Sequence, residues 1–281
     1  MNMSAHNPDF GFYGPGSVAW KVGRETAVLL GGSRAVLMQL AHPLVAIGVS
    51  NHSSYMTDPF GRAERTFMHG EWLMFGSTKK ARQAARTINS LHKSVHGALP
   101  LEAGAHAKGT AYNARDPELL LWVHATLVDT LLLCYTLFIG PLTPEEQDEY
   151  YQQSKQVAHL LGLHPKQMPA SVDDLRRYVH DMVYSDQLAA TPQARRLVQQ
   201  VLFPPAPSIL RPAMHLNYLI TSALLPQPVR EIFSIEWDER RQRLFEASAW
   251  GMRQVIPRLP MALRELPVTR HIISQTLGQT A

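Results

Sequence analysis

The longest apolar stretch of the chain, residues 119–139, restricts the folds that this sequence can adopt. It approaches the length of a membrane-spanning helix, but His124, Asp129 and Thr130 lie near its centre, where such groups cost heavily in lipid. Asp116-Pro117-Glu118 precedes it with an N-cap, a proline at the first helical position and an acid in the first turn. We therefore expect a buried core helix here and no membrane span.

Helical periodicity also dominates the rest of the sequence, and no run of alternating β-branched residues with hairpin turns interrupts it. Capping residues, prolines and glycines delimit the apolar repeats. They predict helices at 17–30, 33–50, 59–75, 78–97, 116–139, 143–162, 171–186, 191–202, 212–224 and 236–256. Residues 97–115 are expected to form a loop. The predicted fold class is all-α, and the predicted organisation is a single domain over residues 1–281, because the proline-rich stretch at 203–207 separates amphipathic helices that need partners.

Charge and cysteine content exclude several classes of protein. The formal net charge is +4, and no run of Lys and Arg suggests a nucleic-acid partner. The single cysteine, Cys134, excludes an intramolecular disulfide, a four-cysteine cluster and a CxxCH haem attachment, and it fits a reducing compartment. The N-terminus has no basic segment followed by an apolar one, so no signal peptide is expected and we predict a cytoplasmic protein.

A histidine, His92, lies on the apolar face of the helix predicted at 78–97. It follows Ile88 by four positions and precedes Val95 by three, and the same face carries Ala81, Ala84, Ala85 and Leu91. A buried imidazole needs a partner for its ring nitrogens, which a core hydrogen bond or a metal ion can provide. His96, one turn further on, makes a metal more plausible, and the spacing leaves both interpretations open.

The helix predicted at 59–75 has a polar strip. Arg62, Thr66 and His69 share a face, and Arg65 lies beside it. Such a strip can line a polar pocket, hold an anionic group or orient a bound oxygen species. The alternative is a solvated face on which Arg62 forms weak surface pairs with Glu64 or Glu71.

His124, in the helix predicted at 116–139, is a second candidate ligand, and the alternative is a hydrogen-bonded core histidine. Missing motifs narrow the chemistry further. The sequence contains no Glu-x-x-His pair of a di-iron bundle, no HExxH zinc helix, no GxSxG elbow, no GxGxxG after a strand and no P-loop. Cys134 lies in an apolar helix, so a thiolate-ligated haem is not expected.

Three stretches of the sequence resemble conserved blocks of one known family. They are LAHPLVAIGVSNHSSYMTDPFGRAERT, the segment around INSLHKSVHG, and GTAYNARDPELLLWVHATLVDTLL. The family is that of the haem-b proteins that include the latex-clearing rubber oxygenases and the MpaB-type oxygenases. The resemblance covers residues 15–185 and is less clear in residues 186–281.

The resemblance implies a globin-like helical fold around a non-covalent haem b, with His92 as the proximal iron ligand. Arg62, Arg65 and Thr66 would match the distal arginine, basic residue and threonine of the family. Rubber oxygenases have a lysine where this chain has Arg65. Because an arginine stays protonated and cannot ligate iron, the sixth position is expected to hold water, oxygen or nothing. His96 stands where the family often has an arginine.

The resemblance also implies a departure in chemistry. Some family members use an acidic base upstream of the arginine block, but residues 33–57 contain no Asp or Glu here. Cleavage of rubber is therefore not expected, and the absence of a signal peptide supports this because a long polymer cannot enter a cell.

Together these features predict a haem-b-dependent oxidoreductase of the oxygenase, peroxidase or peroxygenase type. It would act with O2 or peroxide on a small to medium apolar organic substrate. The expected catalytic residues are Arg62, Arg65, Thr66 and His69, and the expected cofactor-binding residues are His92, His96, Arg62 and His124. Two alternatives stay open: a haem-binding sensor or carrier without turnover, and a non-haem metal enzyme that uses His92 and His96. The sequence does not determine whether the chain forms a homodimer.

Overall fold

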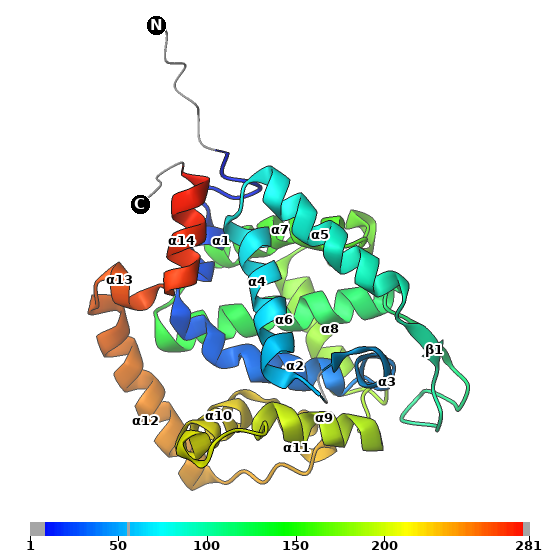
Figure 1. The fold of residues 1–281 in the computed structure, drawn as a ribbon. Coiled ribbons are helices and arrows are strands. Elements are labelled where there is room, and N and C mark those ends of the chain that lie inside the picture. The colour runs from blue at the N-terminus through cyan, green and yellow to red at the C-terminus, as the bar shows by residue number, and fades with distance from the viewer. Residues whose placement is uncertain (1–8, 55–56, 278–281) are drawn as a thin grey trace, which may run out of the picture.

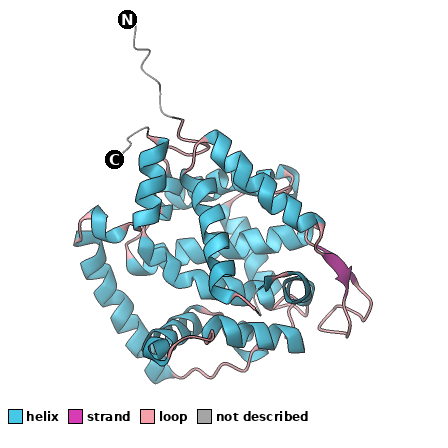
Figure 2. Ribbon diagram, viewed as in Figure 1, coloured by secondary structure: helices cyan, strands magenta, loops and turns pink. Residues whose placement is uncertain are grey.

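The computed structural model of the protein describes residues 9–54 and 57–277. In this part of the chain nearly all regular structure is helical, with one short hairpin of two strands, so the predicted all-α class is confirmed (Figure 2). The α-helices are α1 (Val18–Gly23), α2 (Gly32–Leu40), α3 (Pro43–His52), α4 (Pro59–Phe75), α5 (Thr78–Lys93), α6 (Pro117–Phe138), α7 (Pro144–Leu160), α8 (Val172–Val183), α9 (Pro192–Leu202), α10 (Arg211–Leu224), α11 (Gln227–Ile232), α12 (Glu239–Val255), α13 (Met261–Arg264) and α14 (Pro267–Thr276). The 3-10 helices are η1 (Thr26–Gly31), η3 (Pro165–Gln167), η4 (Ser208–Leu210) and η5 (Ile256–Arg258), and the strands are β1 (His96–Ala98) and β2 (Ala111–Asn113).

The helix α6 forms the centre of the fold, as its apolar sequence predicts. It packs against η1, α2, α7, α8 and α12 (Figure 1). Its polar residue Asp129 accepts a hydrogen bond from Arg34 of α2 at 2.6 Å, which provides the partner that a charge in this position needs.

Two parts of the described chain meet the length and composition criteria of a membrane span. One is α6, and half of its most apolar window is buried inside the protein. The other is the pair Thr26–Leu40 and Pro43–His52, which counts only if its two parts, bent by 106° relative to each other, form one span.

The helix predicted at 33–50 is divided into α2 and α3 at His42. The reason is local, because the residue before a proline avoids helical backbone angles, and His42 precedes Pro43 with an extended conformation. The His42 ring then caps α3, since its Nδ1 accepts the backbone N–H of Leu44 at 3.3 Å. The helix predicted at 17–30 is also divided, into α1 and η1.

The helix predicted at 78–97 ends earlier, at Lys93, and the predicted end is wrong. The chain continues into β1, which pairs antiparallel with β2 in the register His96↔Asn113. Val95 packs against a small apolar cluster that contains Leu44 and Tyr112, and its carbonyl accepts the N–H of Ala114 at 2.9 Å. Tertiary packing of this hairpin therefore outweighs the helical pattern that continues through the sequence.

The last part of the chain returns to α4. α14, which the sequence pattern did not predict, packs against α4 beside α1 (Figure 1). At this contact the hydroxyl of Thr269 donates a hydrogen bond to the buried carboxyl group of Glu71 at 2.5 Å. The C-terminal helix thus supports the helix that carries most of the predicted site residues.

Candidate functional site

The predicted site residues lie mainly on the helical hairpin formed by α4 and α5. Asp58 caps α4 by accepting the N–H of Gly61 at 3.0 Å, and Ser77 caps α5. Only Gly76 and Ser77 separate the two helices, which pack against each other. From this short turn the two helices diverge, so that α4 begins beside α3 and α5 ends at the β-hairpin (Figure 1).

His92, in the last turn of α5, has an unusual environment. Its Nδ1 atom is buried and has no hydrogen-bond partner within residues 9–54 and 57–277. Burial lowers the pKa of the His92 imidazole, and the nearby positive charge of Arg62 lowers this pKa further. The ring is therefore neutral at neutral pH, which is the form that ligates a metal.

Arg62, in the first turns of α4, is held from two sides. Its Nε donates to the Oγ of Ser53 at 3.3 Å, and its Nη1 donates to the Oγ1 of Thr66 at 2.5 Å. The Thr66 hydroxyl in turn donates to the carbonyl oxygen of Arg62 at 3.0 Å. Arg62 and Thr66 thus share a face of α4, as the helical spacing predicts, and the hydrogen bond between them holds the guanidinium whose charge lowers the pKa of His92.

Arg65 has different contacts from Arg62. Its Nη1 donates to Asp58 at 3.1 Å and its Nη2 donates to the Oγ of Ser54 at 2.9 Å. Both members of the Arg65–Asp58 pair are at least half exposed, so the pair adds little stability. These contacts of Arg65 lie at the start of α4, and His92 is not among its partners.

His69 lies one turn beyond Arg65 on α4. Its Nδ1 is 2.6 Å from the carbonyl oxygen of Arg65. Because a carbonyl oxygen only accepts, Nδ1 carries the proton, and in the neutral ring Nε2 keeps its lone pair. His69 can therefore accept a hydrogen bond from a ligand through Nε2. Glu71, considered above as a surface partner of Arg62, is instead buried against Thr269.

His96 does not share a helical face with His92, and the predicted one-turn spacing of these two residues is wrong. α5 ends before His96, whose side chain is exposed on β1. Among the residues that the structure describes, no group of three or more His, Cys, Asp or Glu side chains is arranged to hold a metal ion. The non-haem alternative depended on His92 and His96 lying one helical turn apart, and the structure does not have this arrangement.

His124, the second candidate ligand, has the surroundings of a core histidine. Its Nε2 is 3.2 Å from the Oγ of Ser154 on α7, and its ring lies 6.5 Å from that of Tyr151. Burial lowers the pKa of His124 to about 4, with a smaller contribution from the charge of Lys155. Because one ring nitrogen already has a partner, His124 needs no metal to explain its position.

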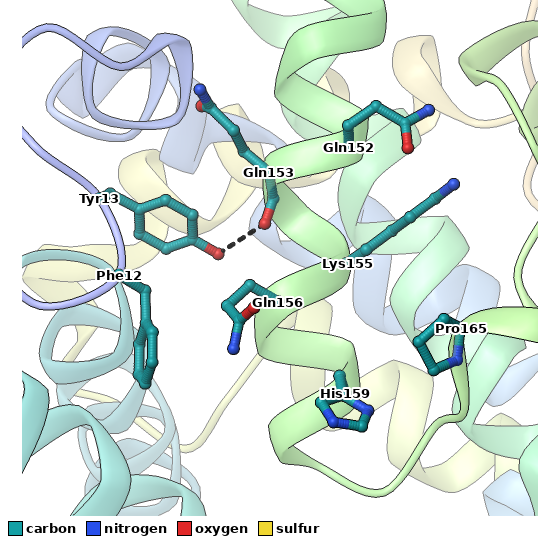
Figure 3. A pocket seen from close by; sticks show the side chains of 8 residues that line it. All are labelled: Phe12, Tyr13, Gln152, Gln153, Lys155, Gln156, His159 and Pro165. Atoms are coloured by element: carbon teal, nitrogen blue, oxygen red, sulfur yellow. Dashed lines mark hydrogen bonds between the residues drawn. The ribbon is translucent and has the colours of Figure 1, made fainter.

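A surface pocket of about 360 Å³ lies between the segment around Tyr13 and helix α7 (Figure 3). The Tyr13 hydroxyl donates to the carbonyl oxygen of Gln153 at 2.9 Å at its edge. Its lining includes Gln152, Gln156 and Lys155. None of the predicted site residues lines this pocket, so it is separate from the candidate site.

Sequence reasoning missed several residues that surround Arg62 and Arg65. The hydroxyl of Ser53 accepts a hydrogen bond from Arg62, and that of Ser54 accepts one from Arg65. Tyr112 of the β-hairpin is hydrogen-bonded to His52 at the end of α3. The two serines follow the end of the helix predicted at 33–50 by three and four positions and are a weak signal. Tyr112 gives no signal at all, because its contact with α3 depends on the fold.

The arrangement combines a neutral imidazole with a fixed guanidinium. A neutral imidazole with an unpartnered nitrogen can ligate a metal, and a guanidinium binds carboxylates. An iron ligand and a partner for a propionate are two of the groups that a haem pocket provides. The residues present therefore fit a haem, as judged from the unpartnered Nδ1 of His92 and the guanidinium beside it.

Comparisons with known proteins relate the chain to a family of oxygenases. Residues 20–254 match the model of the catalytic domain described as "ER-bound oxygenase mpaB/B'/Rubber oxygenase". The chain is 27% identical over 221 residues to the uncharacterized protein Mb2261 of Mycobacterium bovis, a match that covers 75% of this chain and 82% of the relative. The uncharacterized protein Rv2237 of Mycobacterium tuberculosis gives the same values. No solved structure gives a significant match.

Proposed function

Because the chain belongs to the catalytic-domain family of the ER-bound oxygenase mpaB and the rubber oxygenases, we propose that it is a haem-b-dependent oxidoreductase. Its substrate would be a small to medium apolar organic molecule, oxidised with O2 or peroxide. The observation that carries the proposal is the neutral His92, whose buried Nδ1 has no partner in the described structure, next to the fixed guanidinium of Arg62.

Each candidate site residue on α4 and α5 has a defined part in this proposal. His92 would ligate the iron, and Arg62 would pair with a carboxylate of the haem. When bound, the haem would supply the redox chemistry of the reaction. The Thr66 hydroxyl keeps Arg62 in place, and Nε2 of His69 offers an acceptor on the same helix. Arg65 cannot serve as an iron ligand, because its guanidinium stays protonated.

Two exposed apolar side chains support an apolar substrate. Leu91 of α5, the neighbour of His92, is 59% exposed, and Phe60 of α4, which precedes Arg62 by two positions, is 53% exposed. An apolar substrate that binds at this site would contact these two side chains.

The test is a haem titration of the purified protein, followed by absorption spectroscopy. We expect wild type to bind haem b with a Soret band, and His92→Ala to lose it. His124→Ala and His96→Ala are matched controls that should keep it. Full haem binding in His92→Ala together with its loss in His124→Ala would move the ligand to His124. A wild-type protein that binds no haem would refute the proposal.

A haem-binding sensor or carrier is the second candidate function. The observation that favours it is the absence of Asp and Glu from residues 33–57, where some family members have an acidic base. The two functions differ in turnover. Consumption of an apolar organic substrate with O2 or peroxide by the haem-loaded protein would identify an enzyme, and its absence with a panel of such substrates would favour the carrier.

A further inference from the structure

The side chain of Tyr112 connects the two halves of the candidate site. It belongs to β2 and is 4% exposed, and its ring lies against Gly48 of α3 on one side. On β1, a Cβ atom added to Gly97 would lie only 2.7 Å from the Tyr112 hydroxyl oxygen. The absence of a side chain at Gly97 therefore allows this hydroxyl to reach the end of α3.

At that end, the Tyr112 hydroxyl oxygen meets two donors. The Nδ2 of Asn51 lies 3.3 Å from it, and the Nε2 of His52 lies 3.1 Å from it. The same Nε2 lies 3.2 Å from the carbonyl oxygen of His96 on β1. Because a carbonyl oxygen only accepts, Nε2 of His52 carries the proton and donates. His52 and Tyr112 thus bind the last turn of α3 to the β-hairpin.

The α3 side of this connection leads directly to Arg62. Ser53 follows His52, and its N–H donates to the carbonyl oxygen of Val49 at 3.0 Å, so that it ends α3 as the C-cap residue. The hydroxyl of Ser53 accepts from the Nε of Arg62. A shift of the last turn of α3 would therefore move the acceptor that holds the Arg62 guanidinium.

On the other side of this connection, the β-hairpin is bonded to the end of α5, which carries His92. The N–H of Val95 donates to the carbonyl oxygen of His92 at 3.2 Å, and the carbonyl of Val95 accepts from Ala114 of the segment after β2. The end of α5 is thus bonded to the hairpin that contains Tyr112. The Tyr112 hydroxyl group consequently joins the end of α3, which holds Arg62, to the β-hairpin, which is bonded to the end of α5 that carries His92.

We propose that Tyr112 and His52 are positioning residues, which fix the Arg62 guanidinium relative to His92 by joining the end of α3 to the β-hairpin. They act through Ser53 and through the end of α5. The inference rests on the proposed function only for what Arg62 and His92 bind, since the connection itself is made by the chain alone.

The test measures how firmly Arg62 is held in the haem-free protein. The readout is the hydrogen-exchange rate of the Arg62 Nε–H by nitrogen-15 NMR, with the signal assigned by its loss in Arg62→Lys. In Tyr112→Phe and in His52→Ala we expect this exchange to become about fivefold faster, the factor that corresponds to one hydrogen bond of average strength. In His52→Gln, whose amide can still donate to both oxygens, we expect a rate close to that of wild type.

Tyr13→Phe is the matched control. Tyr13 is as buried as Tyr112, and its hydroxyl is also hydrogen-bonded, to the carbonyl oxygen of Gln153. It should leave the exchange of Arg62 unchanged. An unchanged rate in both Tyr112→Phe and His52→Ala would overturn the proposal, and so would an equal increase in all three variants, because this would indicate general loosening. His52 is exposed, so His52→Ala keeps the test valid if Tyr112→Phe does not fold.

Haem titration of the same variants separates this inference from the proposed function. If wild type binds haem, Tyr112→Phe and His52→Ala should bind it more weakly than Tyr13→Phe does. If wild type binds no haem, the proposed function fails, while the exchange rates still decide whether Tyr112 and His52 position Arg62.

Discussion

The guanidinium of Arg62 on α4 lies close enough to the imidazole of His92 on α5 to lower its pKa, together with the burial of the ring. Burial is the larger cause of the lowered pKa, and Arg62 is the second. The site therefore combines a base that is neutral at neutral pH with a cation that is charged at every accessible pH.

Replacing Arg62 by Gln should raise the pKa of His92, because the opposing charge is lost. The pKa should stay below its ordinary value, since the imidazole remains buried. The measurement is an NMR titration of the His92 ring carbons in the haem-free protein. Arg86, which is exposed on α5, provides the control, and Arg86→Gln should leave the titration almost unchanged. Equal effects of the two variants would contradict the prediction.

Glu71 should make the protein less stable as the pH rises. Burial raises the pKa of Glu71 to about 7 from 4.5, and the hydrogen bond from Thr269 opposes this rise only in part. Between these two values the folded state binds more protons than the unfolded state. The stabilisation is therefore complete below pH 4.5 and is lost as the pH rises through 7, with an upper limit of about 3 kcal/mol.

Urea denaturation of wild type and Glu71→Gln between pH 5 and pH 8, at intervals of about one unit, tests this linkage. The difference between the two free energies of unfolding isolates Glu71 from the histidines that also titrate. Glu64→Gln, on the exposed face of α4, is the control and should follow wild type. A pH-independent difference between wild type and Glu71→Gln would disprove the raised pKa.

Arg34 should be among the most sensitive positions of the core. It is buried, and it donates to the carbonyl oxygen of Leu224 at 2.8 Å, to Asp129 at 2.6 Å and to the hydroxyl of Thr130. Arg34→Leu leaves these acceptors without a partner and should cost about 3 kcal/mol or more in the free energy of unfolding. Arg176→Leu, which breaks the exposed pair with Asp173, should cost at most about 1 kcal/mol. Similar losses in denaturant titrations of both would refute this ranking.

Gly31 marks a close approach of η1 to α6. A Cβ atom at this position would lie 2.5 Å from the sulfur of Cys134 and equally close to the methyl group of Thr130. Gly31→Ala should therefore destabilise the protein by about 1 to 3 kcal/mol. Gly140→Ala is the control, because no atom lies within 4 Å of a Cβ there. Thermal unfolding that is lowered equally by both variants would show that the close contact is not the cause.

The helices that the sequence predicted best are those whose own first residues include capping groups. α7 begins where Thr143 and Glu146 form a reciprocal capping box, and α6 begins at the cap Asp116. Such contacts join residues a few positions apart, so a local pattern is enough to find them. The early end of α5 could not be found in this way, because it depends on Val95 packing against residues from α3 and β2.

The same distinction applies to the candidate site. Arg62 and Thr66 were correctly expected to share a face of the helix, since helical spacing alone places them there, and the structure shows that they are also hydrogen-bonded. The separate environments of Arg62 and Arg65 were not expected, because Ser53 and Ser54 distinguish them from outside α4. Haem binding and the role of each site residue stay predictions that the titrations above address.

The close fit between Gly97 and Tyr112 constrains how this protein can vary in evolution. Any side chain at position 97 would occupy the space of the Tyr112 hydroxyl group, so the first change requires a second one at position 112. Relatives should therefore keep the glycine and the tyrosine together or replace them together. A survey of family sequences for paired substitutions at these two positions would reveal which members have given up the connection between α3 and the β-hairpin.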